Sequence, residues 1–274
     1  MEKEQKKRRK ALEKELKIVR KQEEKLQKNF ERAKPAAWKT ALDGKIPQKI
    51  YFGLESTFSK GFSLVFNQGR SLIEKSYNKE KLQADHSIRD YAVQVKGGRK
   101  ELKQLHKSAK RKDSLNMVVT TAEGIALGAL GVGMPDIVLF ISTLLKGIYE
   151  TALNYGYDYE SRDEQYRILK MMAASLNCGE TWWETNAEVE ELMLLENLMV
   201  TEEELNEQIR QTASVFAMDM LLLKFIQGLP VVGILGGLGN PIYYNRVLHY
   251  VQLKYRKRYL QKQLENFEME NPLG

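Results

Sequence analysis

The chain has 274 residues, of which 43% are apolar, and a formal net charge of +7 at pH 7. This length and apolar fraction allow a sizeable core, while the single cysteine excludes an internal disulfide. The N-terminus, MEKEQKKRRK, lacks the apolar segment of a secretory signal. These features argue against a disulfide-bonded secreted protein and predict a cytoplasmic location.

The low proline content indicates the fold class. There are only six prolines and few runs that alternate apolar and polar residues, so we expect an all-α protein. We predict a basic helical arm, residues 1–34, followed by a multi-helix domain, residues 35–274. That domain is expected to be built around two apolar helical hairpins, each broken by glycine and proline.

The excess positive charge is concentrated in the arm. Residues 1–34 contain fourteen Lys or Arg and seven Asp or Glu, which leaves 29 of each kind for the rest of the chain. Two smaller basic clusters follow, at residues 96–112 and 254–262, whereas residues 171–208 are acidic and contain no Lys or Arg. This polarity favours an anionic partner surface on one side of the molecule.

The arm reads as one charged helix with an apolar stripe that is interrupted at Glu23. Three interpretations remain open: the stripe docks on the body, the helix lies on anionic lipid, or it is a coiled-coil or nucleic-acid arm. The interspersed glutamates weaken the lipid and nucleic-acid interpretations. The stripe consists of Leu12, Leu16, Val19, Leu26, Phe30 and Ala33.

Three helices are expected between the arm and the first apolar region. An amphipathic helix is predicted over residues 50–77, a second over 79–95, and a basic surface helix after Gly97 and Gly98. The basic surface helix, the arm and the last helix together supply a predicted basic surface. Its residues are Lys6, Lys7, Arg8, Arg9, Lys10, Lys110, Arg111, Lys112, Arg256, Lys257 and Arg258.

The first apolar region, residues 115–159, contains a break at Gly133-Met134-Pro135-Asp136. One helix is expected to end at Pro135 and the next to begin there, with Asp136 accepting from its free N–H groups. Glycines leave one face of the first helix nearly without side chains. Such a face suits either close helix packing or contact with lipid. The glycines are Gly124, Gly128, Gly131 and Gly133.

Two capping boxes and a second apolar region follow. Ser161 with Glu164 predicts a helix to about residue 176, ended by Gly179, and an acidic helix to about residue 199 comes next. Thr201 with Glu204 predicts the helix that enters the second region, residues 213–245. That region has a Gly-Leu-Pro break, glycines Gly233, Gly236 and Gly237, and a last, basic, tyrosine-rich helix over residues 242–267.

Neither apolar region predicts a simple bilayer crossing. Charged residues limit uncharged runs in the first region to about half of the roughly 20 residues that a spanning helix needs. In the second, Pro230 and Pro241 break a run that is otherwise long enough. Re-entrant or peripheral association stays open.

The sequence contains no recognised catalytic, metal-binding or cofactor motif, so no metal or cofactor is predicted. Three carboxylates interrupt apolar segments: Glu123, Asp136 and Asp219. Structural ion pairing is one explanation for such residues, and general acid or base catalysis with a raised pKa is the other.

The order of these features resembles the bacterial EcsC family. The likeness covers about residues 46–260. It is carried by GALGVGMPDIVLFISTLLKGIYETALNYGYDYESRDEQYRIL, by the later GLPVVGILGGLGNPIYYNRVLHY, and by a basic aromatic helix of the YRKRYL kind. The family is named after a gene beside an ABC transporter operon, and its members are treated as cytosolic or peripheral helical proteins. A hydrolase label is sometimes attached, without agreed catalytic residues.

Composition and resemblance together suggest a cytoplasmic, peripherally membrane-associated accessory protein at the inner face of the cell membrane. It would bind anionic lipid or ABC transporter subunits through its basic helices and glycine-rich hairpins. The alternative is a peptidase- or esterase-like hydrolase that uses the buried carboxylates with a histidine. Nucleic acid is a less favoured partner, because that hypothesis depends on residues 1–34 alone and has no accompanying fold motif.

Overall fold

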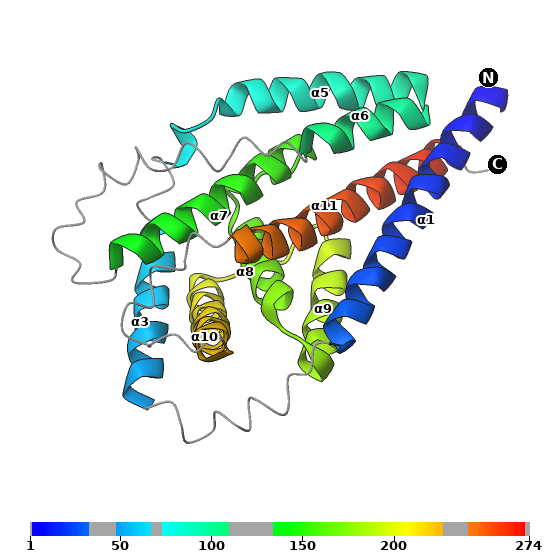
Figure 1. Cartoon of the computed structure of the whole chain (residues 1–274). Helices are drawn as coiled ribbons and strands as arrows, with labels where there is room; N and C mark the ends of the chain where they lie inside the picture. The colour runs from blue at the N-terminus through cyan, green and yellow to red at the C-terminus, as the bar shows by residue number, and fades with distance from the viewer. Residues whose placement is uncertain (1, 33–47, 67–72, 110–133, 227–240, 272–274) are drawn as a thin grey trace.

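The computed structural model describes residues 2–32, 48–66, 73–109, 134–226 and 241–271. Within these ranges the protein contains helices and no strand, which confirms the all-α prediction (Figure 1). The helices are α1 (Glu2–Arg32), α3 (Gln48–Leu64), α5 (Lys79–Lys96), α6 (Arg99–Ala109), α7 (Met134–Asn154), α8 (Arg162–Leu176), α9 (Gly179–Leu194), α10 (Glu202–Ile226) and α11 (Pro241–Glu270).

Helix α11 runs through the middle of the molecule and contacts α1, α7, α8 and α9 (Figure 1). Its residues 251–256 are all buried, so the helix is covered on every side at this point. The sequence-based assignment of Arg256 to a basic surface is therefore wrong. A count of charges could not reveal that other helices carry the matching carboxylates.

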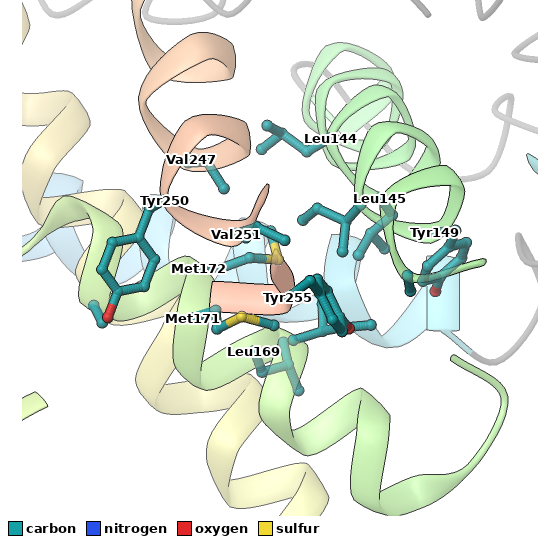
Figure 2. Close-up of a cluster of buried hydrophobic side chains, with 14 of the residues drawn as sticks. Leu144, Leu145, Tyr149, Leu169, Met171, Met172, Val247, Tyr250, Val251 and Tyr255 are labelled. Atoms are coloured by element: carbon teal, nitrogen blue, oxygen red, sulfur yellow. The ribbon is translucent and has the colours of Figure 1, made fainter. Parts of the chain in front are cut away.

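The core forms where α7, α8 and α11 meet (Figure 2). Aliphatic residues of α7 face α11, and methionines of α8 fill the space beneath them, as flexible thioether side chains can. Tyr149 of α7 also stacks on Tyr159, with ring centroids 4.0 Å apart. The buried residues shown include Leu144, Leu145, Tyr149, Leu169, Met171, Met172, Val247, Val251 and Tyr255.

Several predicted helix ends are confirmed by their hydrogen bonds. The Ser161 hydroxyl accepts from the Glu164 N–H at 3.2 Å. Thr201 and Glu204 form a reciprocal capping box, with bonds of 3.2 Å and 2.8 Å. Helix α5 ends at Gly97, which has φ of +54° and donates to the Val93 carbonyl.

Other boundaries differ from the prediction. Helix α3 ends at Leu64, short of the expected helix to residue 77, and α9 ends at Leu194 instead of about residue 199. Gly179 begins α9 and does not end α8. These ends depend on tertiary contacts more than on local propensity.

The described parts of the two apolar regions lie together. Phe140 of α7 contacts the rings of Phe216 in α10 and Tyr243 in α11, with centroids 6.1 Å and 6.5 Å apart. Helices α7 and α11 begin at Met134 and Pro241, close to the predicted starts. The hairpin turns and the first arm of region one lie outside the described residues, so they stay predictions.

One strained connection joins α9 to α10. Met199 has φ of +56°, which is unusual for a residue other than glycine. The Asp163 carboxylate accepts from the backbone N–H groups of Leu198, Met199 and Val200 at 2.7 to 3.3 Å. Burial opposes ionisation of Asp163, but these bonds outweigh it and hold its pKa below the ordinary value of 3.8.

We predict that Asp163→Asn destabilises this connection by about 1–2 kcal/mol at neutral pH, because an amide replaces a charged acceptor of three hydrogen bonds. A lowered folded-state pKa gives stability that is present above the unfolded value near 4 and is lost as pH falls through the folded value. Hydrogen exchange at Leu198 to Val200 should therefore differ between the two proteins at pH 7 and converge in acid. A difference that grows in acid would contradict this role.

Candidate functional site

Helix α1 has an inner face that packs on the body. Leu12 and Val19 are fully buried and Leu16 is nearly so. They lie against α11, with α6 and α9 on either side (Figure 1). The described part of the predicted apolar stripe thus docks the arm on the rest of the protein, while the side chain of Phe30 and residue Ala33 lie outside the described residues. This contact fixes which side of α1 faces outward.

A buried ion pair anchors the middle of α1. The Glu15 carboxylate accepts from Arg256 and from Arg99, each at 2.5 Å. Arg256 also donates to His106 Nε2 at 3.2 Å. Because a guanidinium can only donate, His106 Nε2 is an acceptor, and its Nδ1 carries the proton facing the Tyr155 hydroxyl at 2.8 Å. Helices α1, α6 and α11 are joined by this network.

A second ionic cluster explains the charge that interrupts the apolar stripe. Glu23 accepts from Lys254 at 3.0 Å and from Lys257 at 2.8 Å, and Glu190 of α9 binds the same two lysines. Burial opposes the charged form of Glu190, but the lysines outweigh it and lower its pKa. Burial also disfavours charged Lys257, yet Glu190 and Glu23 raise its pKa. Both shifts favour the charged forms of Glu190 and Lys257, and the four ion pairs of the cluster hold α1 against α9 and α11.

The outer face of α1 carries a continuous row of lysines. Successive members are three or four residues apart, which places them on one side of a helix. All are exposed, and none has an ion-pair partner among the described residues. We call this set the lysine row: Lys7, Lys10, Lys14, Lys17, Lys21, Lys25 and Lys28.

Two of the carboxylates of α1 are turned away from the lysine row. Glu15 and Glu23 point inward and are ion-paired to other helices. Glu13 is paired with Arg9 at 3.1 Å, and Glu4 and Glu24 remain exposed. The glutamates that weakened the lipid interpretation are thus partly withdrawn from the surface. The sequence reasoning missed Lys14 to Lys28 because it compared charges along the segment and not around the helix.

The other predicted basic residues divide into three groups. Lys6, Lys7 and Lys10 are exposed. Each of four others is ion-paired: Arg8 with Glu270, Arg9 with Glu13 and Glu268, Lys257 with Glu23 and Glu190, and Arg258 with Glu164. Lys110, Arg111 and Lys112 lie outside the described residues.

The catalytic candidates give no assembled site in the described structure. Asp219 is half-buried and lies 3.9 Å from the guanidinium of Arg246. His86 contacts the Asn154 carbonyl with Nδ1, and His106 belongs to the Glu15 network. Glu123 and the side chain of Asp136 lie outside the described residues. In the part of the chain that the structure describes, no three His, Cys, Asp or Glu residues form a group able to hold a metal ion.

Most residues of the predicted lipid or packing face also lie outside the described residues. Pro135 lies in the first turn of α7, and the glycines Gly124, Gly128, Gly131, Gly133, Gly233, Gly236 and Gly237 lie outside the described residues. Among the described helices, one segment, Ile137–Asn154, is long and apolar enough to cross a membrane, but 83% of it is buried within the protein. Its burial is typical of a core helix.

Comparison with known proteins identifies one family. The model of the EcsC protein family matches residues 10–260, which include most of α1 and nearly all of the helical body. Among curated proteins and solved structures, none matches this chain.

We predict that Glu15→Gln lowers the free energy of unfolding by about 3 kcal/mol, because Arg256 stays buried without its counter-charge. The matched control is Glu13→Gln, two residues earlier on α1, which breaks only an exposed pair and should cost less than about 1 kcal/mol. Chemical denaturation of both variants measures the difference. Equal effects would show that the Glu15 network does not anchor α1.

Proposed function

Because the chain belongs to the EcsC protein family, we propose that it is a cytoplasmic accessory protein that binds peripherally to an anionic membrane surface. From the family resemblance we also expect a partner at that membrane, an ABC transporter. The observation that carries the proposal is the lysine row of α1, which is exposed, unpaired within the described structure and fixed in direction by buried contacts.

The length of the row suits a membrane surface. Lys7 and Lys28 are separated by 21 residue steps, so the row extends along about 30 Å of helix. A basic residue near an anionic leaflet contributes about 1 kcal/mol, and several acting together produce firm but reversible binding. Because the row lies on a docked helix, little conformational freedom is lost when it meets a surface.

Electrostatic binding of this kind has a characteristic salt dependence. Screening shortens the range of the interaction to about 3 Å at 1 M salt, so a purely electrostatic contact is released.

The alternative hydrolase hypothesis draws no support from the described residues, since Asp219 is ion-paired with Arg246.

We predict that the protein sediments in low salt with phosphatidylcholine vesicles that contain phosphatidylglycerol, and not with phosphatidylcholine alone. The variant Lys10→Gln, Lys14→Gln, Lys17→Gln, Lys21→Gln should bind the anionic vesicles at least tenfold more weakly, because four charges leave the row. Sedimentation across a lipid titration measures both affinities.

The control removes four charges elsewhere. Lys49, Lys60, Lys75 and Lys262 are exposed and lie on other helices or turns. Their replacement by glutamine lowers the net charge by the same amount. Because these lysines lie outside the lysine row, it should weaken binding far less than the change in the row. A wild-type protein that stays in the supernatant in low salt would refute the proposal, and equal loss in both variants would refute the role of the row.

A further inference from the structure

Helix α5 carries a second unusual surface feature. Ile88, Tyr91 and Val95 are 68%, 68% and 64% exposed, although each has a large apolar side chain. They are three and four residues apart and therefore share one face of the helix. We call them the α5 stripe. Large apolar side chains that are exposed together on one face mark contact sites more often than those scattered singly.

The opposite face of α5 holds the stripe in place. Val93 is buried, and Asp90 accepts from the Tyr259 hydroxyl at 2.6 Å and from Gln263 at 2.9 Å. His86 contacts the Asn154 carbonyl at 3.0 Å. These contacts with α7 and α11 fix the rotation of α5, so the stripe points away from the body.

Cations border the C-terminal end of the stripe. Lys96 is exposed in the last turn of α5, and the Gly97-Gly98 connection leads directly into α6. Helix α6 exposes Lys100, Lys103 and Lys107 at the same three- and four-residue spacing. None of these four lysines has an ion-pair partner among the described residues.

The first turns of α1 reach the same place. A Cβ built on Gly97 would lie 2.7 Å from Cβ of Arg8, so α1 touches the end of α5 (Figure 1). Exposed Lys6, Lys7 and Lys10 are on these turns. Two carboxylates of α5 are already engaged, since Asp85 is paired with Arg89 and Asp90 is hydrogen-bonded to α11.

From this juxtaposition we propose that the α5 stripe inserts into the interfacial region of an anionic bilayer, while the lysines of α6 and the start of α1 bind the headgroups. This inference rests on the proposed function and adds to it an apolar contact. An apolar helix face beside basic residues is the pattern of helices that lie in the plane of a membrane interface. The surrounding cations favour this occupant over a second copy of the same cationic surface.

The apolar contact has a signature that the lysine row lacks. Burial of apolar side chains does not weaken as salt rises, so part of the vesicle binding should persist at high salt. In high salt, the variant Ile88→Ser, Tyr91→Ser, Val95→Ser should bind the vesicles at least tenfold more weakly than the wild type. In low salt it should keep most of the binding. Because the three side chains are already exposed, its circular dichroism and thermal midpoint should match the wild type.

The matched control removes apolar side chains from other surfaces. Phe52, Trp183 and Leu194 are 58%, 44% and 62% exposed and lie on α3 and α9. Their replacement by serine should leave binding at both salt concentrations unchanged.

A fluorescent label tests insertion directly. With Cys178→Ser as background, a polarity-sensitive dye on Tyr91→Cys should shift to the blue when phosphatidylglycerol vesicles are added, and a dye on Glu203→Cys should not. Glu203 is exposed on α10, away from α5 (Figure 1).

The outcomes separate the two proposals. Suppose that the wild type binds anionic vesicles and that the stripe variant binds them as tightly as the wild type at both salt concentrations. The inference then fails and the proposed function stands. If the wild type does not bind, the proposed function fails. A wild-type dimer that becomes a monomer in the stripe variant, measured by light scattering, would identify a second copy as the occupant and overturn the inference.

Discussion

The arrangement of the helices depends on neutralising the cations of α11. Residues 254–258 place four basic side chains within or beside the core, and an unpaired charge there would cost several kcal/mol. Their carboxylate partners come from three other helices: Glu15 and Glu23 from α1, Glu164 from α8 and Glu190 from α9. Such pairs add little net stability over apolar packing, but they allow few alternative positions for those three helices. The pairing therefore determines where α1 lies and which way it faces.

That orientation produces the candidate surface. When α1 turns its apolar stripe, Glu15 and Glu23 toward the body, the lysine row is left facing outward. The same interactions that stabilise the interior thus separate the charges of the helix, with part of the negative charge inside and the lysines outside. A membrane responds to the local potential of the surface that it meets and not to the composition of the segment. This is why an arm with seven glutamates can still present a cationic face.

Sequence patterns predicted the features that depend on neighbouring residues. Ser161 with Glu164 and Thr201 with Glu204 form their capping boxes within a few residues, and the α1 stripe repeats at helical spacing. The burial of Arg256 was not predictable in this way, because its partner Glu15 is 241 residues distant in sequence. Composition alone does not distinguish a basic helix that is exposed from one that is buried and paired. The spacing of the lysine row is visible in the sequence. Whether the row is exposed depends on which face of α1 docks on the body, and the sequence does not show this.

The position of α1 also bears on the kind of partner that the surface can bind. A flexible basic tail can wrap around many anionic shapes, whereas a docked helix presents its charges in one line and suits a broad, flat partner. The α5 stripe meets the start of that helix at Gly97, where the positive φ permits the sharp turn into α6 and a side chain would clash with Arg8. A compact glycine connection thus brings apolar and basic groups together at one end of the molecule. This combination of separate charge and apolar contacts is what reversible attachment to a bilayer requires, since neither alone gives both long-range attraction and resistance to salt.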